Sequence, residues 1–166
     1  LTSPDLMDIY GVGDVRGAAN MVGTAQGYPT MLGKFPSMNG EDNVTLFRVE
    51  EMHLIAAETS LRAGNAADAL SYLNNIPAIR GLGADYYASA TLENILEERR
   101  KEFAFEGLRF HDLSRMGMDM PSVDPFKQTN DDLTGTPPAY GSYRYAYPIA
   151  LSERNANPNM VQNYGY

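Results

Sequence analysis

Residues 47–74 read FRVEEMHLIAAETSLRAGNAADALSYLN and carry the most regular pattern in the chain. Apolar residues recur there at helical spacing on both sides of Gly64. The first stripe consists of Val49, Met52, Ala56 and Thr59, and it is widened by Leu54, Ile55 and Leu61. Glycine is the residue best suited to the left-handed position that ends a helix, and Asn65 can begin the next one. The pattern predicts one helix from about Val44 to Ala63 and a second from Asn65.

Two helices joined by so short a turn must pack antiparallel. The pair spans residues 46–76, is rich in alanine and resembles one tetratricopeptide unit. A single unit of this kind cannot bury its own apolar face. The sequence therefore predicts a mainly α fold, in which this hairpin packs with further helices and long irregular loops.

The remaining segments are assigned by their glycines, prolines and caps. Residues 1–45 are rich in glycine and proline and are expected to be loop with at most short strands. A connector containing Pro77 is expected over 76–90. Thr91 can cap a third helix, and a fourth is expected over about 108–116. The inner face of the third helix is predicted to comprise Leu92, Ile95, Leu96, Arg99 and Phe103. Residues 117–166 are expected to form a long loop and an irregular tail.

Residues 98–115 read ERRKEFAFEGLRFHDLSR and form the densest charged segment. Apolar residues are interleaved, so several charges must be half-buried and must find partners. Opposite signs are balanced, which favours a structural ion network over an anion or substrate site. Glu106 and Arg109 can pair at the i,i+3 spacing. The predicted network consists of Arg99, Glu102, Glu106, Arg109, Asp112 and Arg115.

Three signals of enzymes or metal sites are weak. Glu50 and His53 have the Glu-x-x-His spacing of di-iron bundles, but such a site needs a second copy of the motif, and the chain has none. Residues 11–17 superficially resemble a glycine-rich phosphate loop, without the preceding strand and following helix that such a site requires. Asn130-Asp131-Asp132 lacks the spaced ligands of an EF-hand loop. The sequence predicts no catalytic residue, metal or cofactor.

Composition excludes several classes of partner. The formal net charge of −8 disfavours binding to nucleic acid and to anionic lipid. The chain has no cysteine, which rules out disulfides and thiolate chemistry within it. No apolar run approaches the ~18 residues that can span a bilayer. The chain opens on Leu1, which suggests a mature or truncated product.

Taken together, the motifs resemble those of the SusD/RagB family. Residues 47–58 are similar to its "R-x-x-E-x-x-L-I-x-A-E" helix, and residues 63–74 to its "G-x-x-x-x-A-L-x-x-L-N" helix. The charged segment is similar to "E-R-R-x-E-x-x-x-E-G-x-R-x-x-D-L-x-R". The tail from Tyr147 is similar to "Y-P-I-P…E…N-P…Q-N-P-G-Y". Nearer the start of the chain, Asp14-Val15-Arg16 and Lys34-Phe35 resemble the family's "D-P-R" and "K-Y/F" motifs. Val15, Ala150 and Tyr164 replace prolines of the pattern.

The resemblance implies a nutrient-binding lipoprotein on the surface of the bacterial outer membrane. Such a protein caps a SusC-like TonB-dependent barrel. It delivers oligosaccharide or peptide ligands to the barrel without catalysing a reaction. Its lipid anchor would lie outside this segment. The chain would be the C-terminal part of a single SusD-like domain, divided into a loop-rich part over 1–45, the helix pair over 46–76, the charged helices over 91–116, and the loop and tail over 117–166.

Sugar recognition commonly uses aromatic faces together with a few polar groups. The chain has 11 tyrosines, several of them in expected loops. Tyr10 and Tyr28, in glycine-rich loops, are the preferred ligand-binding candidates, although packing is the commoner role of such residues.

Two other classes of function remain open. A tetratricopeptide-type interaction scaffold would show further repeats, and none is visible after Ile76. A hydrolase would present an exposed pair of carboxylates within residues 98–112. It would be excluded if Glu102, Glu106 and Asp112 were instead paired with Arg99, Arg109 or Arg115.

Overall fold

The computed structural model describes residues 4–17, 24–25, 28–29, 33–37, 39–121 and 137–166. They form two compact units, Leu1–Glu106 and Gly107–Tyr166. The first unit contains α1, β1, β2, α2, α3 and α4, and the second contains α5, a 3-10 turn and α6.

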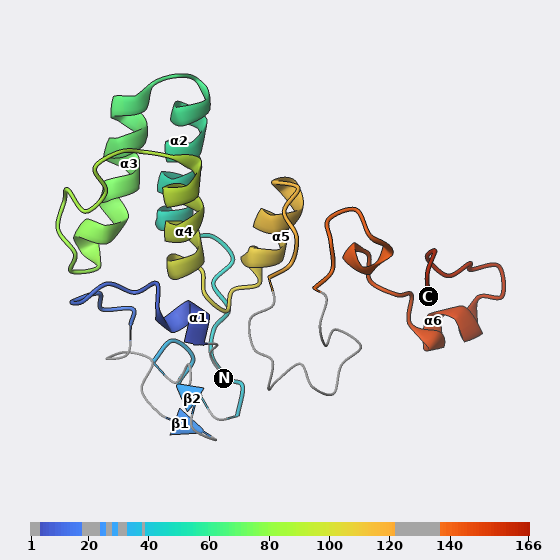
Figure 1. The fold of residues 1–166 in the computed structure, drawn as a ribbon. Coiled ribbons are helices and arrows are strands. Elements are labelled where there is room, and N and C mark those ends of the chain that lie inside the picture. The colour runs from blue at the N-terminus through green and yellow to red at the C-terminus, as the bar shows by residue number, and fades with distance from the viewer. Residues whose placement is uncertain (1–3, 18–23, 26–27, 30–32, 38, 122–136) are drawn as a thin grey trace. The chain divides into compact units, whose positions relative to one another are not determined.

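The first unit is built on three helices that lie side by side (Figure 1). Helix α2 covers Val49–Arg62 and α3 covers Ala66–Ile79. Between them Gly64 has a φ of 82°, the left-handed conformation predicted for the residue that ends a helix. Asn65 is the N-cap of α3 as predicted, although its side chain makes no capping hydrogen bond. The two helices run antiparallel, which confirms the predicted hairpin.

Two predicted helix boundaries were wrong. Helix α2 begins at Val49 rather than near Val44, because Arg48 is extended, with φ −132° and ψ 145°. Its side chain reaches the end of α4 from this position, as described below. Helix α3 continues through Pro77 to Ile79, although a connector was predicted from Ile76. Ile76 and Pro77 are both fully buried, and this burial offsets the backbone hydrogen bond that proline cannot donate.

The predicted apolar stripe of the first helix was confirmed at Leu54 and was wrong at Val49, Met52 and Ile55. The buried side chains of α2 are Leu54, Ala57 and Glu58. Val49, Met52 and Ile55 are exposed instead, at 70%, 50% and 44%. Helix α2 has apolar side chains on two sides, and periodicity alone could not show which side faces α3 and α4.

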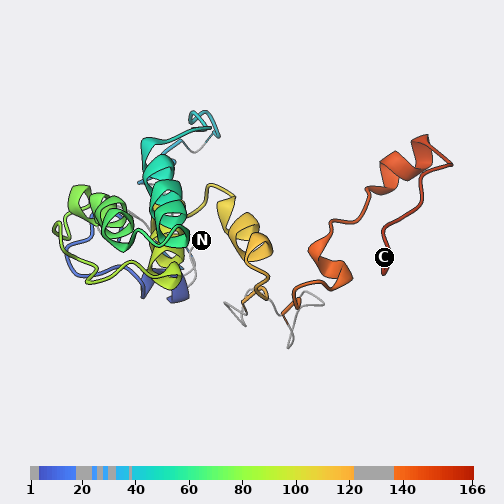
Figure 2. The same ribbon diagram turned by 90° about the horizontal axis from the view of Figure 1, so that it is seen from above.

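Helix α4, over Leu92–Glu102, closes the core of the first unit. The Thr91 hydroxyl accepts a hydrogen bond from the backbone N–H of Asn94 at 3.1 Å, which confirms the predicted cap. Ile95 and Leu96 are buried, as predicted for its inner face. Figure 2 shows α2, α3 and α4 from above, packed around a shared interior. The core at this junction comprises Leu54, Ala57, Ala69, Leu73, Ile76 and Ile95.

Short elements of the N-terminal part complete the first unit. Helix α1 covers Pro4–Met7, and strands β1 (Thr24–Ala25) and β2 (Tyr28–Pro29) pair antiparallel. The Asp5 carboxylate pairs with Arg100 of α4. The loop over 11–17 returns to α3, where the Val15 N–H donates to the Arg80 carbonyl at 3.0 Å. These contacts place the N-terminal segment against the ends of α3 and α4.

The second unit begins with α5, over Leu108–Arg115, whose N-cap Gly107 has a φ of 79°. The tail was predicted to be irregular, and it contains a 3-10 turn at Tyr143–Tyr145 and helix α6 over Leu151–Ala156. Aromatic pairs connect its segments, including Phe110 with Tyr145 at 5.7 Å between ring centroids.

Nearly all regular secondary structure in the described residues is helical, which confirms the predicted fold class. Within this part of the chain, the helices are too short or too polar to cross a membrane. Asn130-Asp131-Asp132, considered above for calcium, lies outside the described residues.

Candidate functional site

A cluster of buried charges lies where α4 ends, and Glu102 is its centre. Glu102 is the last residue of α4 and is 3% exposed. Its carboxylate accepts hydrogen bonds from Arg16 at 2.9 Å and from Arg80 at 3.0 and 2.7 Å. Arg48 also donates to it. We call Glu102 and these three arginines the Glu102 hub.

The three arginines come from separate parts of the chain. Arg16 lies in the loop over 11–17, Arg48 is the N-cap of α2, and Arg80 is the C-cap of α3. One carboxylate therefore connects the N-terminal segment and the ends of three helices. Arginine suits this role because its planar fork donates several hydrogen bonds in fixed directions and stays charged when buried.

The hub keeps Glu102 ionised. Burial by itself raises the pKa of the Glu102 carboxyl, because a charge loses solvation in the interior. Hydrogen bonding and charge from Arg80, and the charges of Arg48 and Arg16, outweigh this effect and lower the pKa to about 2. Glu102 is thus an anion at any physiological pH.

Arg16 extends the hub to two further carboxylates. It donates to Glu98 at 2.6 Å and to Asp14 at 2.9 and 2.8 Å. Burial lowers the pKa of Arg16. Hydrogen bonds and charge from Asp14 and Glu98 raise this pKa by more than burial lowers it, so the net shift is upward. The Tyr87 hydroxyl also donates to Glu98, at 2.9 Å. Glu98 is fully buried, and these donors satisfy its carboxylate.

Lys34 and Glu106 form the outer edge of the cluster. The Lys34 ammonium contacts the Glu106 carboxylate at 2.5 Å and donates to the carbonyls of Glu102 and Ala104 at 3.0 and 2.9 Å. Arg48 donates to the same Glu106 carboxylate at 2.5 Å. Burial lowers the pKa of Lys34, and the nearby Glu106 opposes that shift. This edge is less buried than the hub, with the Lys34 side chain 33% exposed.

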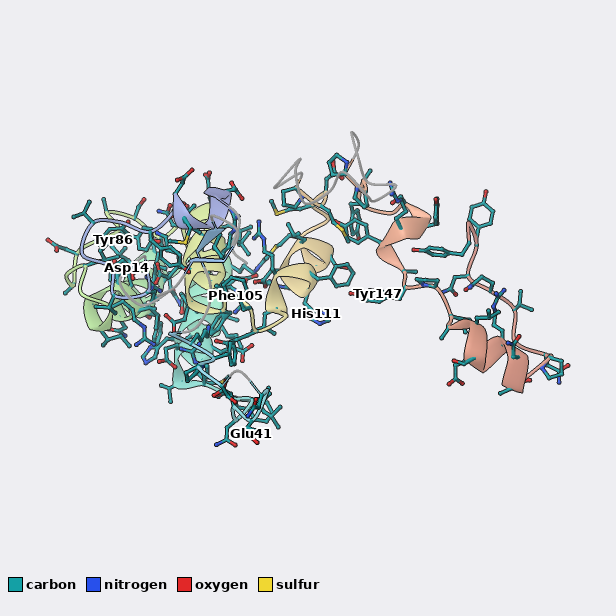
Figure 3. The ribbon with its side chains drawn as sticks, turned by 90° about the horizontal axis from the view of Figure 1, so that it is seen from below. Asp14, Glu41, Tyr86, Phe105, His111 and Tyr147 are labelled. Carbon is teal, nitrogen blue, oxygen red and sulfur yellow. The ribbon has the colours of Figure 1, made fainter. Side chains whose placement is uncertain are left out.

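A cavity of about 250 Å³ opens beside the hub. Its walls combine the aromatic rings of Tyr10 and Phe105 with charged groups of the cluster. Figure 3 labels Phe105, which lies just beyond the end of α4. The lining residues are Tyr10, Val15, Arg16, Gly33, Lys34, Arg48, Arg80, Lys101, Glu102, Ala104 and Phe105.

The predicted ion-network residues fall in both units. Glu102 and Glu106 lie at the hub and its edge. Arg99 is buried and stacks over the Phe103 ring, with its guanidinium carbon 5.3 Å from the ring centroid. Asp112 and Arg115 pair with each other at 2.9 Å along α5. Arg109 belongs to the second unit, so its predicted pairing with Glu106 stays a prediction.

Of the two tyrosines preferred as ligand contacts, the structure describes the side chain of Tyr10 but not that of Tyr28. Tyr10 lines the cavity, and its hydroxyl donates to the Lys101 carbonyl at 3.0 Å. Burial raises the pKa of Tyr10 to about 12, so the hydroxyl stays protonated. The backbone of Tyr28 lies in β2, and its side chain is outside the described residues.

Sequence reasoning missed most partners of Glu102 and Glu106. Arg16, Lys34 and Arg48 stand in motifs that were recognised, but nothing in those motifs showed that they converge on α4. Arg80 was not singled out at all. Its one local signal is its place at the end of a helix, where a positive charge is favoured.

The residues considered for a metal site and a phosphate loop make contacts within the protein. The Nδ1 atom of His53 lies 3.3 Å from the Asn75 side-chain amide, and its ring lies 6.0 Å from that of Tyr72. The loop over 11–17 carries Asp14 and Arg16 into the charged cluster. Among the described residues, no group of three or more histidine, aspartate and glutamate side chains is placed to hold a metal.

Comparison with known proteins decides the family. The model of the SusD family matches residues 26–166. The chain belongs to the SusD family. It is also 32% identical over 126 residues to the starch-binding protein SusD of Bacteroides thetaiotaomicron, a match covering 76% of this chain and 22% of that protein.

Solved structures agree with this assignment. A SusD superfamily protein from Bacteroides thetaiotaomicron superposes with a TM-score of 0.74 at 30% identity, covering 97% of this chain and 40% of that one. A putative sugar binding protein from Bacteroides vulgatus gives a TM-score of 0.70 at 31% identity, covering 98% and 38%. The chain thus spans about a fifth of the length of the starch-binding relative and about two fifths of these structures.

Proposed function

We propose that the protein containing this chain binds nutrient glycans without catalysis and delivers them to a transporter. Membership of the SusD family carries this proposal, because a curated relative is a starch-binding protein and a structural relative is named as a putative sugar binding protein. By analogy with the family, the protein would be a cell-surface lipoprotein of the outer membrane that caps a SusC-like TonB-dependent barrel. This chain would be the C-terminal part of one SusD-like domain.

The charged cluster supports a non-catalytic role. A general acid for glycoside hydrolysis needs a carboxyl with a raised pKa, paired with a second carboxylate across an open cleft. Glu102 has the opposite property, since its pKa is lowered to about 2 by the arginines around it. Glu98, Glu102 and Glu106 are each paired with arginine. These groups contribute structure rather than proton transfer.

The first test uses the full-length protein on an array of neutral and acidic oligosaccharides, with peptides printed beside them. We expect binding to one class of glycan and no release of shortened products after prolonged incubation. Binding to peptides alone would replace the glycan with a peptide nutrient. Product release would overturn the non-catalytic role.

The second test addresses the transporter. Affinity purification of the full-length protein from outer membranes should recover a TonB-dependent barrel, and surface proteolysis of intact cells should remove the protein. Recovery from the cytoplasm without a barrel would contradict both the location and the partner.

An interaction scaffold is the alternative function. The exposed apolar side chains Val49, Met52 and Ile55 on α2 favour it, because a tetratricopeptide groove uses such a face to hold a partner. Under this alternative, Met52→Asp would abolish capture of a protein partner. Under the proposed function, the same substitution would leave glycan binding unchanged.

A further inference from the structure

Phe105 lies at the meeting point of two cavities of the first unit. Besides the cavity beside the Glu102 hub, a second one of about 260 Å³ is lined by Phe105, Lys34 and Arg48 as well. The second cavity also has neutral polar side chains, from Asn43 and Thr45. The ring of Phe105 is therefore available from a space that is partly aromatic and partly polar.

The backbone of Phe105 is in an uncommon conformation. Its φ is 68°, and among the described residues it is the one non-glycine with a positive φ. A bulky side chain is sterically strained there, and strain of this kind persists where the surrounding structure or a function requires it. Burial does not account for it, since Phe105 is 37% exposed. The strained backbone holds an apolar ring at the surface.

The polar groups around the ring are fixed in place. Lys34 and Arg48 both contact the Glu106 carboxylate at 2.5 Å, and Lys34 also donates to the Ala104 carbonyl. Such pairs present donors and acceptors in set directions, with little rotational freedom left to lose on binding. We call Lys34, Arg48 and Glu106 the charged rim.

The charges of the rim select against a charged ligand. An anion near Lys34 and Arg48 would also meet Glu106 and Glu102, and a cation would meet the two basic groups. A neutral molecule rich in hydroxyl groups avoids both repulsions and can donate to the carboxylate while accepting from the cations. An aromatic face beside such groups suits the C–H surface of a sugar ring.

We propose that Phe105 is a stacking platform for one ring of a neutral sugar, whose hydroxyl groups are bound by the charged rim and by Asn43. This inference rests on the proposed function and names a site for it. It also adds a residue to the ligand candidates, since the sequence pointed to Tyr10 and Tyr28 and gave no reason to choose Phe105.

The test compares variants of the full-length protein on the array of neutral and uronic-acid oligosaccharides, with affinities measured by calorimetry for the neutral glycan that binds best. Phe105→Gly removes the ring and also relieves the strained φ. We expect its affinity to fall by about tenfold, with an unchanged or higher melting temperature. Phe105→Tyr keeps a ring and should bind within about twofold of the parent.

Tyr72→Ala is the matched control, because Tyr72 is 38% exposed and lies on α3 outside both cavities. Its affinity should equal that of the parent. Asn43→Ala is a second probe that does not depend on the turn at Phe105, since Asn43 is exposed and outside any helix. We expect it to weaken binding by about threefold.

The outcomes separate the site from the function. A parent that binds neutral glycans while Phe105→Gly and Asn43→Ala bind equally well would overturn the site and leave the proposed function standing. A parent that selects acidic glycans would also overturn the site. If the parent binds no glycan, the proposed function fails, and the site fails with it. Should Phe105→Gly lower the melting temperature, unchanged binding by Asn43→Ala would decide against the proposal.

Discussion

The two units of the chain are stabilised by different means. The first unit buries a continuous apolar core, including Leu54, Leu73 and Ile95, and adds a cluster of buried charges. In the described part of the second unit, the buried side chains are few: Asp112, Leu113 and Pro138. Aromatic pairs and hydrogen bonds to the backbone connect its short segments instead.

The contrast shows how stability depends on the distance that contacts span along the chain. The Glu102 hub joins residues 86, 54 and 22 positions apart, so its loss affects the whole unit. In the second unit, the hydrogen bonds of Gln162 span 13 positions or fewer. The substitutions below should therefore have global effects in the first unit and local effects in the second.

The largest effect is expected from Glu102→Ala. It leaves Arg16, Arg48 and Arg80 partly buried without their shared carboxylate, which should cost about 3–5 kcal/mol of unfolding free energy. Urea denaturation followed by circular dichroism would measure it. Glu93→Ala, an exposed glutamate at the start of the same helix, is the control and should cost well under about 1 kcal/mol. Equal losses for the two variants would show that the hub adds no stability.

Leu73→Ala tests the apolar part of the same unit. Leu73 is fully buried between helices, so its truncation leaves a cavity and should cost about 3 kcal/mol. Ile79→Ala, at an exposed position of the same helix, should change stability by less than about 1 kcal/mol. Denaturation curves of both proteins would show whether the apolar core and the charges contribute similar amounts.

Acid should weaken the first unit through Glu102. Its pKa falls from 4.5 to about 2 on folding, so its ionised form stabilises the protein fully above about pH 5. That contribution, about 3 kcal/mol, is lost as the pH falls toward 2. Denaturation of the parent and of Glu102→Gln between pH 6 and pH 2 would measure it. The stability of the variant should depend less on pH, and parallel curves would contradict the assignment.

The smallest effect is expected in the second unit, from Gln162→Ala. The Gln162 side-chain amide accepts from the Ile149 N–H at 2.8 Å and donates to the Ile149 carbonyl at 3.0 Å. Its loss should speed amide exchange at Ile149 by about fivefold, equivalent to about 1 kcal/mol. The global melting temperature should stay within about 1 °C. A large drop in melting temperature would show that the tail contributes to the stability of the whole chain.

Local signals in the sequence predicted the local features well. Thr91 as a cap and Gly64 as a helix end follow from what single residues do to a backbone. The continuation of α3 through Pro77 could not be predicted, because it depends on burial against other helices. The exposure of Val49 and Met52 has the same cause, since periodicity shows that a stripe exists but not what covers it.

The candidate site was predicted in part for the same reason. The density of charge around Glu102 indicated a network, and balance of sign indicated pairing. The partners Arg16, Lys34 and Arg80 are distant in sequence, and no spacing rule connects them to α4. Phe105 gave no signal, because a left-handed backbone at a phenylalanine is not encoded in any local pattern.

The separation of the hub's partners along the chain also sets an order of assembly. Helices α2 and α3 are neighbours in sequence, so their hairpin closes a short loop and can form early. Arg16 must close a loop of 86 residues to reach Glu102, an entropic cost that is met only once the helices are in place. The hub would then form after the rate-limiting barrier to folding, and weakening it would speed unfolding while leaving the folding rate nearly unchanged. In kinetic terms, the buried charges would set the lifetime of the folded state rather than the speed at which it is reached.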